Sequence, residues 1–326
     1  MQTTGQEPTP NPNKALWEKG DFTRIAESMR ESGEALVGRL GVRQGLRVLD
    51  LGFGDGTTAL PAARLGAEVL GVDIARNLVE AGNRRAKQEG LTNCRFQEGD
   101  ANNLSQLKDG SFELVVSIFG AMFAPKPFDV AKEMVRVTQE GGRIVMRNWI
   151  PNDPTMVAQL LKISSAHLSP PPEGFISPMT WGIESNVIER FSSAGILKER
   201  ISFVRDTFTL NFRGKPSDLV ETFRTYYGPT MNAFEAAEKN HQADDLRRQL
   251  DALFQPEQMP RPESDLDPGE LPPGHGGPLR LRVPRQLGYK NVKYITRLTV
   301  TDDLKRFGAG LGSASPEGGY AWYAGI

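Results

Sequence analysis

The chain has 326 residues, which corresponds to about two domain-sized units of roughly 150 residues each. Its 39 basic and 40 acidic residues leave a net charge of −1, so no overall field attracts the protein to nucleic acid or to an anionic membrane. With 38% hydrophobic and 24% charged residues, the composition is typical of a globular protein that can bury a core. The 34 glycines and 23 prolines also predict loops or linkers.

Cysteine and histidine usage limits the kinds of site that the chain can build. A single cysteine, Cys94, excludes an intramolecular disulfide and a zinc site made of several cysteines. His167, His241 and His275 lie far apart and lack the spacing of metal ligands. No run of about 18 apolar residues predicts a membrane span, and residues 1–13 are polar, without an apolar signal core. We therefore expect a cytoplasmic protein without a metal ion and without a nucleic-acid or membrane partner.

Strands and helices alternate through the central part of the chain, after two amphipathic helices predicted within residues 14–39. The predicted strands are 47–51, 68–72, 93–97, 112–118 and 142–149, and the predicted helices between them are 57–65, 75–89 and 127–138. These strands are apolar and do not alternate with polar residues in a regular pattern. They therefore predict a parallel sheet that is covered by helices on both faces.

The second half of the chain is less regular. It predicts a helix at 185–194, a long strand at 201–212, helices at 218–227 and 231–254, and a final strand at 291–300. We expect an α/β fold with a doubly wound, Rossmann-like, seven-stranded and mostly parallel sheet, plus a helical cap inserted before the last strand. The expected boundaries are a disordered lead-in at 1–13, lid helices at 14–45, the core at 46–213, a cap at 214–288 with a Pro/Gly-rich stretch at 255–285, a last core strand at 289–301 and a tail at 302–326.

The most specific motif is a glycine-rich turn between the first predicted strand and the first core helix. Gly52, Gly54 and Gly56 allow a tight turn against a ligand because they carry no Cβ. In a dinucleotide fingerprint the third glycine would stand one residue later. Asp50 also ends the strand at a position where dinucleotide sites need no acid. This pattern favours a ligand with a cationic group over a pyrophosphate.

Two further acids follow the ends of the next two predicted strands. Asp73 is placed to accept hydrogen bonds from both hydroxyls of a ribose, as in NAD sites, or to cap the following helix. Asp100 is placed to accept from an adenine amino group, or to form a turn with Gly99. No phosphate-binding lysine accompanies these acids. The pattern therefore predicts a nucleoside ligand that lacks phosphates.

These segments resemble the class I S-adenosylmethionine-dependent methyltransferases, in particular the small-molecule, type 11 (UbiE-like) subgroup. The resemblance extends over about residues 17–300, and its most specific parts are 48–58, 71–74, 98–101, 112–117 and 133–143. Phe53 and Asp55 are ordinary variants within the glycine-rich turn. The resemblance implies S-adenosyl-L-methionine as cofactor and S-adenosyl-L-homocysteine as product. It implies a cofactor site made of Asp50, Gly52, Phe53, Gly54, Gly56, Asp73, Ile74, Asp100, Ala101, Ser117 and Phe119.

The methyl acceptor is not identified by the resemblance, although aromatic and methionine side chains suggest a small apolar or aromatic molecule. Candidate substrate-binding residues, each with core packing as the alternative, are Trp17, Phe22, Met122, Phe123, Trp149, Trp181, Tyr226 and Tyr227. His167 is a candidate general base, with a surface or hydrogen-bonded role as its alternative. No fixed catalytic motif is present, so we expect catalysis to rest on holding the nucleophile, the methyl carbon and the sulfur in line.

Two other classes of function stay open at the level of sequence. One is a nicotinamide oxidoreductase on the same kind of sheet, which the glycine spacing and Asp50 disfavour. The other is a protein that binds the cofactor without transferring a methyl group, as a cyclase or an interaction module. The acceptor atom (oxygen, nitrogen or carbon) and the oligomeric state also stay open.

Overall fold

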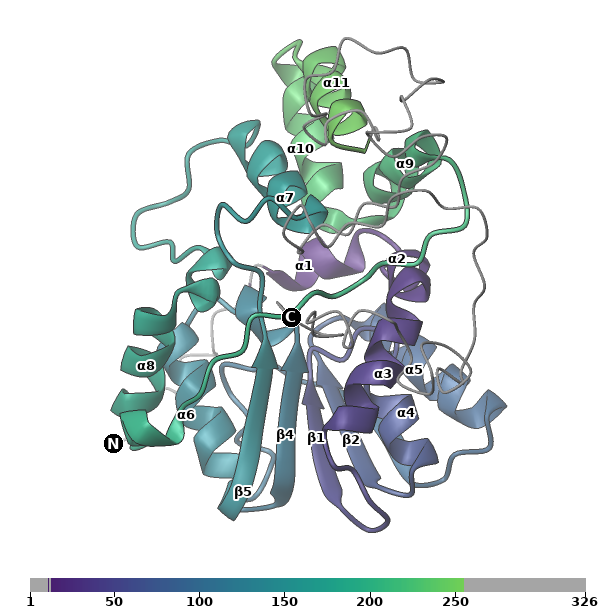
Figure 1. Ribbon diagram of the computed structural model, residues 1–326. Coiled ribbons are helices and arrows are strands. Elements are labelled where there is room, and N and C mark those ends of the chain that lie inside the picture. Colours follow the sequence, from purple (N-terminus) through teal and green to yellow (C-terminus); the bar gives the residue numbers. More distant parts are fainter. Residues whose placement is uncertain (1–10, 12, 255–326) are drawn as a thin grey trace, which may run out of the picture. The chain divides into compact units, whose positions relative to one another are not determined.

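The computed structural model describes residue 11 and residues 13–254. Their single sheet has five parallel strands in the order β3–β2–β1–β4–β5 (Figure 1). The strands are β1 (Arg47–Leu51), β2 (Glu68–Asp73), β3 (Cys94–Glu98), β4 (Phe112–Ile118) and β5 (Thr138–Arg147). The strand order reverses between β1 and β4. The carboxyl ends of these two strands therefore flank the crevice where open α/β sheets bind their ligands.

Helices cover both faces of this sheet because its strands are apolar on both faces. The core helices are α3 (Arg30–Arg39), α4 (Ala59–Arg64), α5 (Arg76–Gln88), α6 (Pro127–Val137) and α8 (Glu184–Ser193). Successive strand residues point to opposite faces. Val48 and Leu114 accordingly belong to one apolar cluster with residues of α3 and α4, whereas Leu49 and Val115 belong to another with residues of α6.

The remaining α-helices form an N-terminal segment and a cap, and three further 3₁₀ turns, η2 (Ala121–Phe123), η3 (Pro178–Gly182) and η4 (Lys198–Arg200), lie in the connections. The N-terminal segment consists of α1 (Asn13–Glu18), α2 (Thr23–Ala26) and the 3₁₀ turn η1 (Glu27–Met29). The cap, at the top of Figure 1, consists of α7 (Met156–Ala166), α9 (Pro216–Tyr226), α10 (Gly228–Lys239) and α11 (Ala243–Phe254). The cap helices pack against one another, and α1 contacts α10. The predicted helices at 218–227 and 231–254 thus correspond to three shorter helices of the cap.

The prediction of a strand at 201–212 is wrong. This segment is extended but belongs to no sheet, and Phe208 is its only buried residue. Its apolar alternation reflects no pairing with a neighbouring strand. The Asn211 amide, for example, donates to the Ser28 carbonyl at 2.7 Å. The predicted strand at 289–301, like the stretch 255–285 and the tail 302–326, lies outside the described residues. Within the described part the sheet has five strands, not seven.

Ser117 joins the two central strands near their carboxyl ends. Its hydroxyl donates a hydrogen bond of 2.7 Å to the Leu51 carbonyl and accepts one of 2.8 Å from the Ala121 amide. Ser117 is buried, so water cannot replace either partner. This hydroxyl therefore fixes β4, and the turn that follows it, against the end of β1.

We expect Ser117→Ala to lower the free energy of unfolding by about 2 kcal/mol, because it leaves a buried carbonyl and a buried amide without partners. Urea denaturation measures the change. Ser111→Ala is the matched control, since the Ser111 hydroxyl bonds the Lys108 carbonyl at an exposed turn; we expect it to stay within about 0.5 kcal/mol of wild type. Equal losses in the two variants would contradict this role.

Candidate functional site

A pocket lies at the carboxyl ends of β1, β2 and β4, between the glycine-rich turn and the N-terminal segment, with a cavity volume of about 100 Å³. Most of the predicted cofactor residues line it: Asp50, Gly52, Phe53, Gly54, Asp73, Ile74, Asp100, Ala101 and Phe119. Gly56 and Ser117 do not. Gly56 faces Leu60 and Phe96. The hydroxyl of Ser117 forms hydrogen bonds with the Leu51 carbonyl and the Ala121 amide.

The turn after β1 depends on glycine for its backbone conformation. Gly52, Gly54 and Gly56 have φ values of 66°, 63° and 92°, in the left-handed region that side chains disfavour. Space is also limiting, since a Cβ on Gly52 would lie 2.5 Å from the Cα of Gly120. The turn therefore brings the backbone itself to the pocket wall.

Asp50 and Asp73 place two buried carboxyl groups beside this turn. Asp73 accepts hydrogen bonds from the amides of Gly54 (3.2 Å) and Ala75 (3.0 Å), so it connects the turn to the start of α5. Asp50 has one carboxylate oxygen, Oδ2, that is buried and without a partner in the described chain. Burial raises the pKa of Asp50 to about 8, with a further increase from the charge of Asp73.

The pKa of Asp73 is also raised by burial, to about 6, although the amides of Ala75 and Gly54 oppose this increase. Among the described residues that line the pocket, none is lysine, arginine or histidine. A ligand with a positive charge would therefore supply the counter-charge that these carboxylates lack.

Residues 11 and 13 close the pocket beside Asp100. The Asn11 amide donates to Asp100 Oδ2 at 3.0 Å, and the Asn13 amide donates to the carbonyl of Phe123. Both asparagines line the pocket, and α1 begins at Asn13, although the sequence predicts disorder for 1–13. This polar, Pro-rich stretch has no apolar periodicity that could have indicated the contact.

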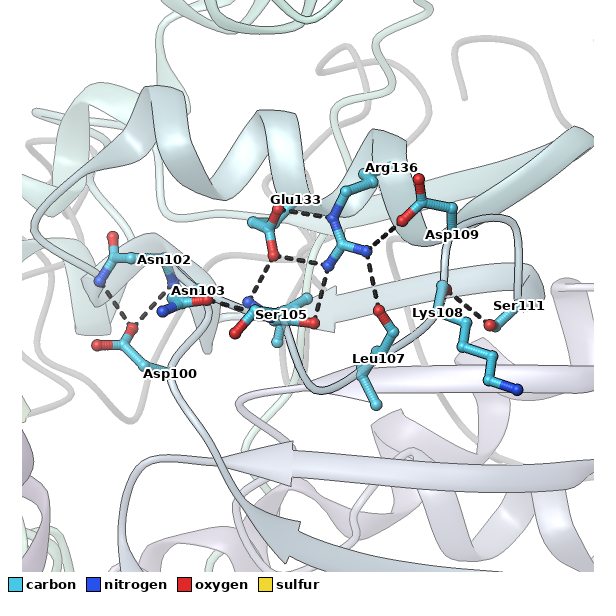
Figure 2. Close-up of polar contacts among 11 residues, drawn as sticks. Asp100, Asn102, Asn103, Ser105, Leu107, Lys108, Asp109, Ser111, Glu133 and Arg136 are labelled. Carbon is cyan, nitrogen blue, oxygen red and sulfur yellow. Dashed lines mark hydrogen bonds and ion pairs between the residues drawn. The ribbon is translucent and has the colours of Figure 1, made fainter.

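The loop that carries Asp100 is held in place by α6 (Figure 2). Arg136 forms ion pairs with Glu133 (2.8 Å) and Asp109 (2.6 Å) and donates to the carbonyls of Leu104 and Leu107. Its guanidinium lowers the pKa of Glu133, which in turn accepts from the Leu104 amide. Asp100 itself accepts from the amide and the side chain of Asn102. The carboxylate of Asp100 is thus fixed from both sides, by its own loop and by Asn11.

Several of the predicted substrate residues form an aromatic group over the pocket. Trp17, Phe22 and Phe123 line it, with ring centroids 5.7 Å apart for Trp17–Phe22 and 4.9 Å for Trp17–Phe123. Tyr227, which is buried, adds its ring 5.8 Å from Trp17. This group combines the N-terminal segment, the turn after β4 and the cap.

A second aromatic contact lies where β4 and β5 end. Phe119 has a left-handed backbone (φ 58°), which is strained for a residue with a side chain and often marks a functional position. Its ring stacks on Trp149 at 3.8 Å with an angle of 6°, and Phe208 packs against it edge-on. Phe119 lines the pocket, whereas Trp149 does not line it and contacts it only through the stacked Phe119 ring.

The other candidates lie away from the pocket. Met122 is in the core, and Trp181 is buried beneath Arg190 and lines a separate groove along β5. Tyr226 packs under Arg24. His167 ends α7 within the cap, where its Nε2 is 3.5 Å from the side-chain nitrogen of Gln249. The structure thus does not bring His167 to the pocket.

Sequence reasoning missed several residues that line the pocket: Asn11, Asn13, Met29, Thr57, Thr58 and Leu78. It also treated Asp55 as an ordinary variant, whereas its side chain is fully buried and ion-paired. Thr57 and Thr58 follow the glycines directly, so the motif itself was a signal for them. Met29 and Asp55 had no comparable local signal.

No helix among residues 13–254 is long and apolar enough to cross a membrane. In that part of the chain, no group of three or more His, Cys, Asp and Glu side chains is arranged to hold a metal ion.

The raised pKa of Asp50 predicts how stability depends on pH. A carboxyl group with a higher pKa in the folded state binds its proton more tightly there, so stability is lost as pH rises between the unfolded and folded values. From about pH 5 to about pH 7.5, the unfolding free energy of wild type should fall by about 3 kcal/mol more than that of Asp50→Asn.

Urea denaturation across this pH range measures the difference. Asp129→Asn is the control, because Asp129 is exposed on α6, and its curve should run parallel to that of wild type. If Asp50→Asn also runs parallel to wild type, Asp50 is not the group that titrates in this range.

Two family models match separate parts of the chain. Residues 49–146, which contain most of the pocket, match a model described as a methyltransferase domain. Residues 266–306 match a model described as an oxidoreductase molybdopterin binding domain. The second segment is outside the described residues and includes the predicted last strand at 289–301.

Individual proteins are also similar to this chain. The uncharacterized protein Rv1403c of Mycobacterium tuberculosis is 32% identical over 228 residues, which cover 69% of this chain and 80% of that protein. The methyltransferase GfsG of Streptomyces halstedii is 33% identical over 145 residues, or 44% of this chain and 52% of that protein. A crystal structure of a SAM-dependent methyltransferase from Aquifex aeolicus has a TM-score of 0.43 and 20% identity, over 61% of this chain and 94% of that one.

Proposed function

Because this chain belongs to the class I S-adenosylmethionine-dependent methyltransferases of the type 11 kind, we propose that it methylates a small apolar or aromatic molecule. The acceptor nucleophile is an oxygen, nitrogen or carbon atom. The observation that carries the proposal is the pocket, where a left-handed glycine turn meets three carboxylates and no basic side chain lines the described walls. Such a pocket favours a cationic nucleoside and disfavours a pyrophosphate.

The residues present fit S-adenosylmethionine. Asp73 would accept from the ribose hydroxyls, Asp100 from the adenine amino group, and the unpartnered oxygen of Asp50 from the ammonium of the methionine part. Gly52 and Gly54 would let the backbone approach the ligand without a Cβ between them. When bound, this cofactor supplies an electrophilic methyl group on a positively charged sulfur.

The contribution of the protein to methyl transfer is then alignment and exclusion of water. Trp17, Phe22 and Phe123 cover the pocket, and Phe119 with Trp149 forms a rigid aromatic wall at the ends of β4 and β5. Flat apolar surfaces of this kind suit a flat apolar acceptor. The near-neutral net charge agrees with a small-molecule partner rather than nucleic acid or a membrane surface.

Calorimetric titration with S-adenosylmethionine and S-adenosylhomocysteine tests the cofactor. We expect Asp73→Asn to weaken binding of both by about 10- to 100-fold, which corresponds to about 1.4–2.8 kcal/mol, because two backbone contacts and the ribose contacts lose a charged acceptor. Asp129→Asn, an exposed aspartate, should bind as wild type does. Binding of NADH in place of S-adenosylmethionine would contradict the proposed cofactor.

Turnover with methyl-labelled S-adenosylmethionine tests the acceptor. A panel of phenols, aromatic amines and other small apolar nucleophiles, analysed by mass spectrometry, should yield a product heavier by one methyl group. Methylation of protein or nucleic acid alone would contradict the proposed substrate class. Cofactor binding without a methylated product from any acceptor would contradict methyl transfer itself.

A further inference from the structure

Asp55 is the buried centre of an ionic network in the glycine-rich turn. Asp55 stands between Gly54 and Gly56 in the sequence, and its side chain is fully buried. One carboxylate oxygen is 2.6 Å from Arg30 Nη2, and the other is 3.0 Å from Arg85 Nη1. The Thr57 hydroxyl donates to the same carboxylate at 3.0 Å. A buried carboxylate with two guanidinium partners is held far more firmly than an exposed ion pair.

The two arginines come from different parts of the fold. Arg30 is the first residue of α3, directly after the N-terminal segment, and Arg85 is near the end of α5. Arg85 also donates to the backbone carbonyl of Asp55 at 2.8 Å, so it fixes the main chain of the turn as well as its side chain. Through Asp55 the turn is therefore connected both to the N-terminal segment and to the core.

The residues beside this network are those that face the cofactor pocket. Met29 precedes Arg30 and lines the pocket, as do Gly54 and Thr57. The approach of α3 is close, since a Cβ on Gly33 would lie 2.5 Å from the side chain of Thr57. Phe22 packs directly on Gly54, where a Cβ would meet its ring at 3.1 Å. A shift of α3 would thus displace both the N-terminal segment, which covers the pocket, and the glycine-rich turn, which lines it.

We propose that Asp55 is a positioning residue for the cofactor, which, together with Arg30 and Arg85, holds the glycine turn in its binding conformation and joins the N-terminal segment to it. The inference rests on the proposed function, because the affinity that it concerns is that for S-adenosylmethionine. Arg85 fixes the turn against the core. Through Arg30, the ordered conformation of residues 13–30 depends on the turn. Asp55 itself does not line the pocket and acts through its neighbours.

Binding of S-adenosylhomocysteine to the full chain, measured by calorimetry, tests the role of the network. We expect Asp55→Asn and Arg30→Gln each to raise the Kd at least tenfold, and Arg30→Lys to recover part of the loss. The double variant should bind no more weakly than Asp55→Asn, because Arg30 then has no carboxylate to lose. Arg248→Gln is the matched control, since Arg248 forms an exposed ion pair with Asp245 on α11, and its Kd should not change.

Hydrogen exchange separates positioning from a general loss of structure. In wild type, S-adenosylhomocysteine should slow exchange of residues 13–30 and 52–58 together. In Arg30→Gln it should still protect 52–58 at saturating ligand but no longer protect 13–30. If Asp55→Asn does not fold, the Arg30 variants carry the same test.

Three results would overturn this role: a wild-type Kd in a folded Asp55→Asn, additive losses in the double variant, or unchanged protection of 13–30 in Arg30→Gln. If wild type itself binds neither S-adenosylmethionine nor S-adenosylhomocysteine, the proposed function fails, and this role fails with it. The two failures are distinguished by the wild-type titration.

Discussion

The left-handed glycine turn after β1 is the constraint on which the rest of the site depends. Three positive φ angles and the contact of Gly52 with Gly120 leave no room for a side chain, so the main chain itself forms the pocket floor. Asp73 holds this floor through the Gly54 amide, and Asp55 holds it from the other side. The Asp73 carboxylate and the N-terminal segment are thus both placed relative to this turn.

The core of the fold is predictable from sequence because its strands are buried on both faces. The mainly apolar runs at 47–51, 68–72 and 112–118 agree with β1, β2 and β4 to within a residue. The segment 201–212 shows the limit of this reasoning. Alternation indicates that one face of an extended segment is covered, but it does not identify a neighbouring strand, and strand pairing is decided by contacts far away in the sequence.

The residues of the candidate site likewise include some that the sequence predicts and some that it does not. The acids at the strand ends are predictable, because the carboxyl ends of parallel strands lie at one edge of the sheet for any conformation of the loops. The roles of Asp55 and Asn11 were not, because their partners are 25 and 30 residues away for Asp55 and 89 residues away for Asn11. Such contacts depend on how helices and loops pack, and a local motif carries no information about them.

β5 is the last strand in the order of the described sheet, so one of its edges faces away from β4. In the described part of the chain no strand pairs with this edge. An unpaired strand edge offers its backbone amides and carbonyls to any extended chain that reaches it. Glu140, Arg143 and Arg147 place charges along β5, as is common for natural edge strands. Charges on an edge strand oppose edge-to-edge pairing of sheets, and neutral residues at the same positions would remove that protection.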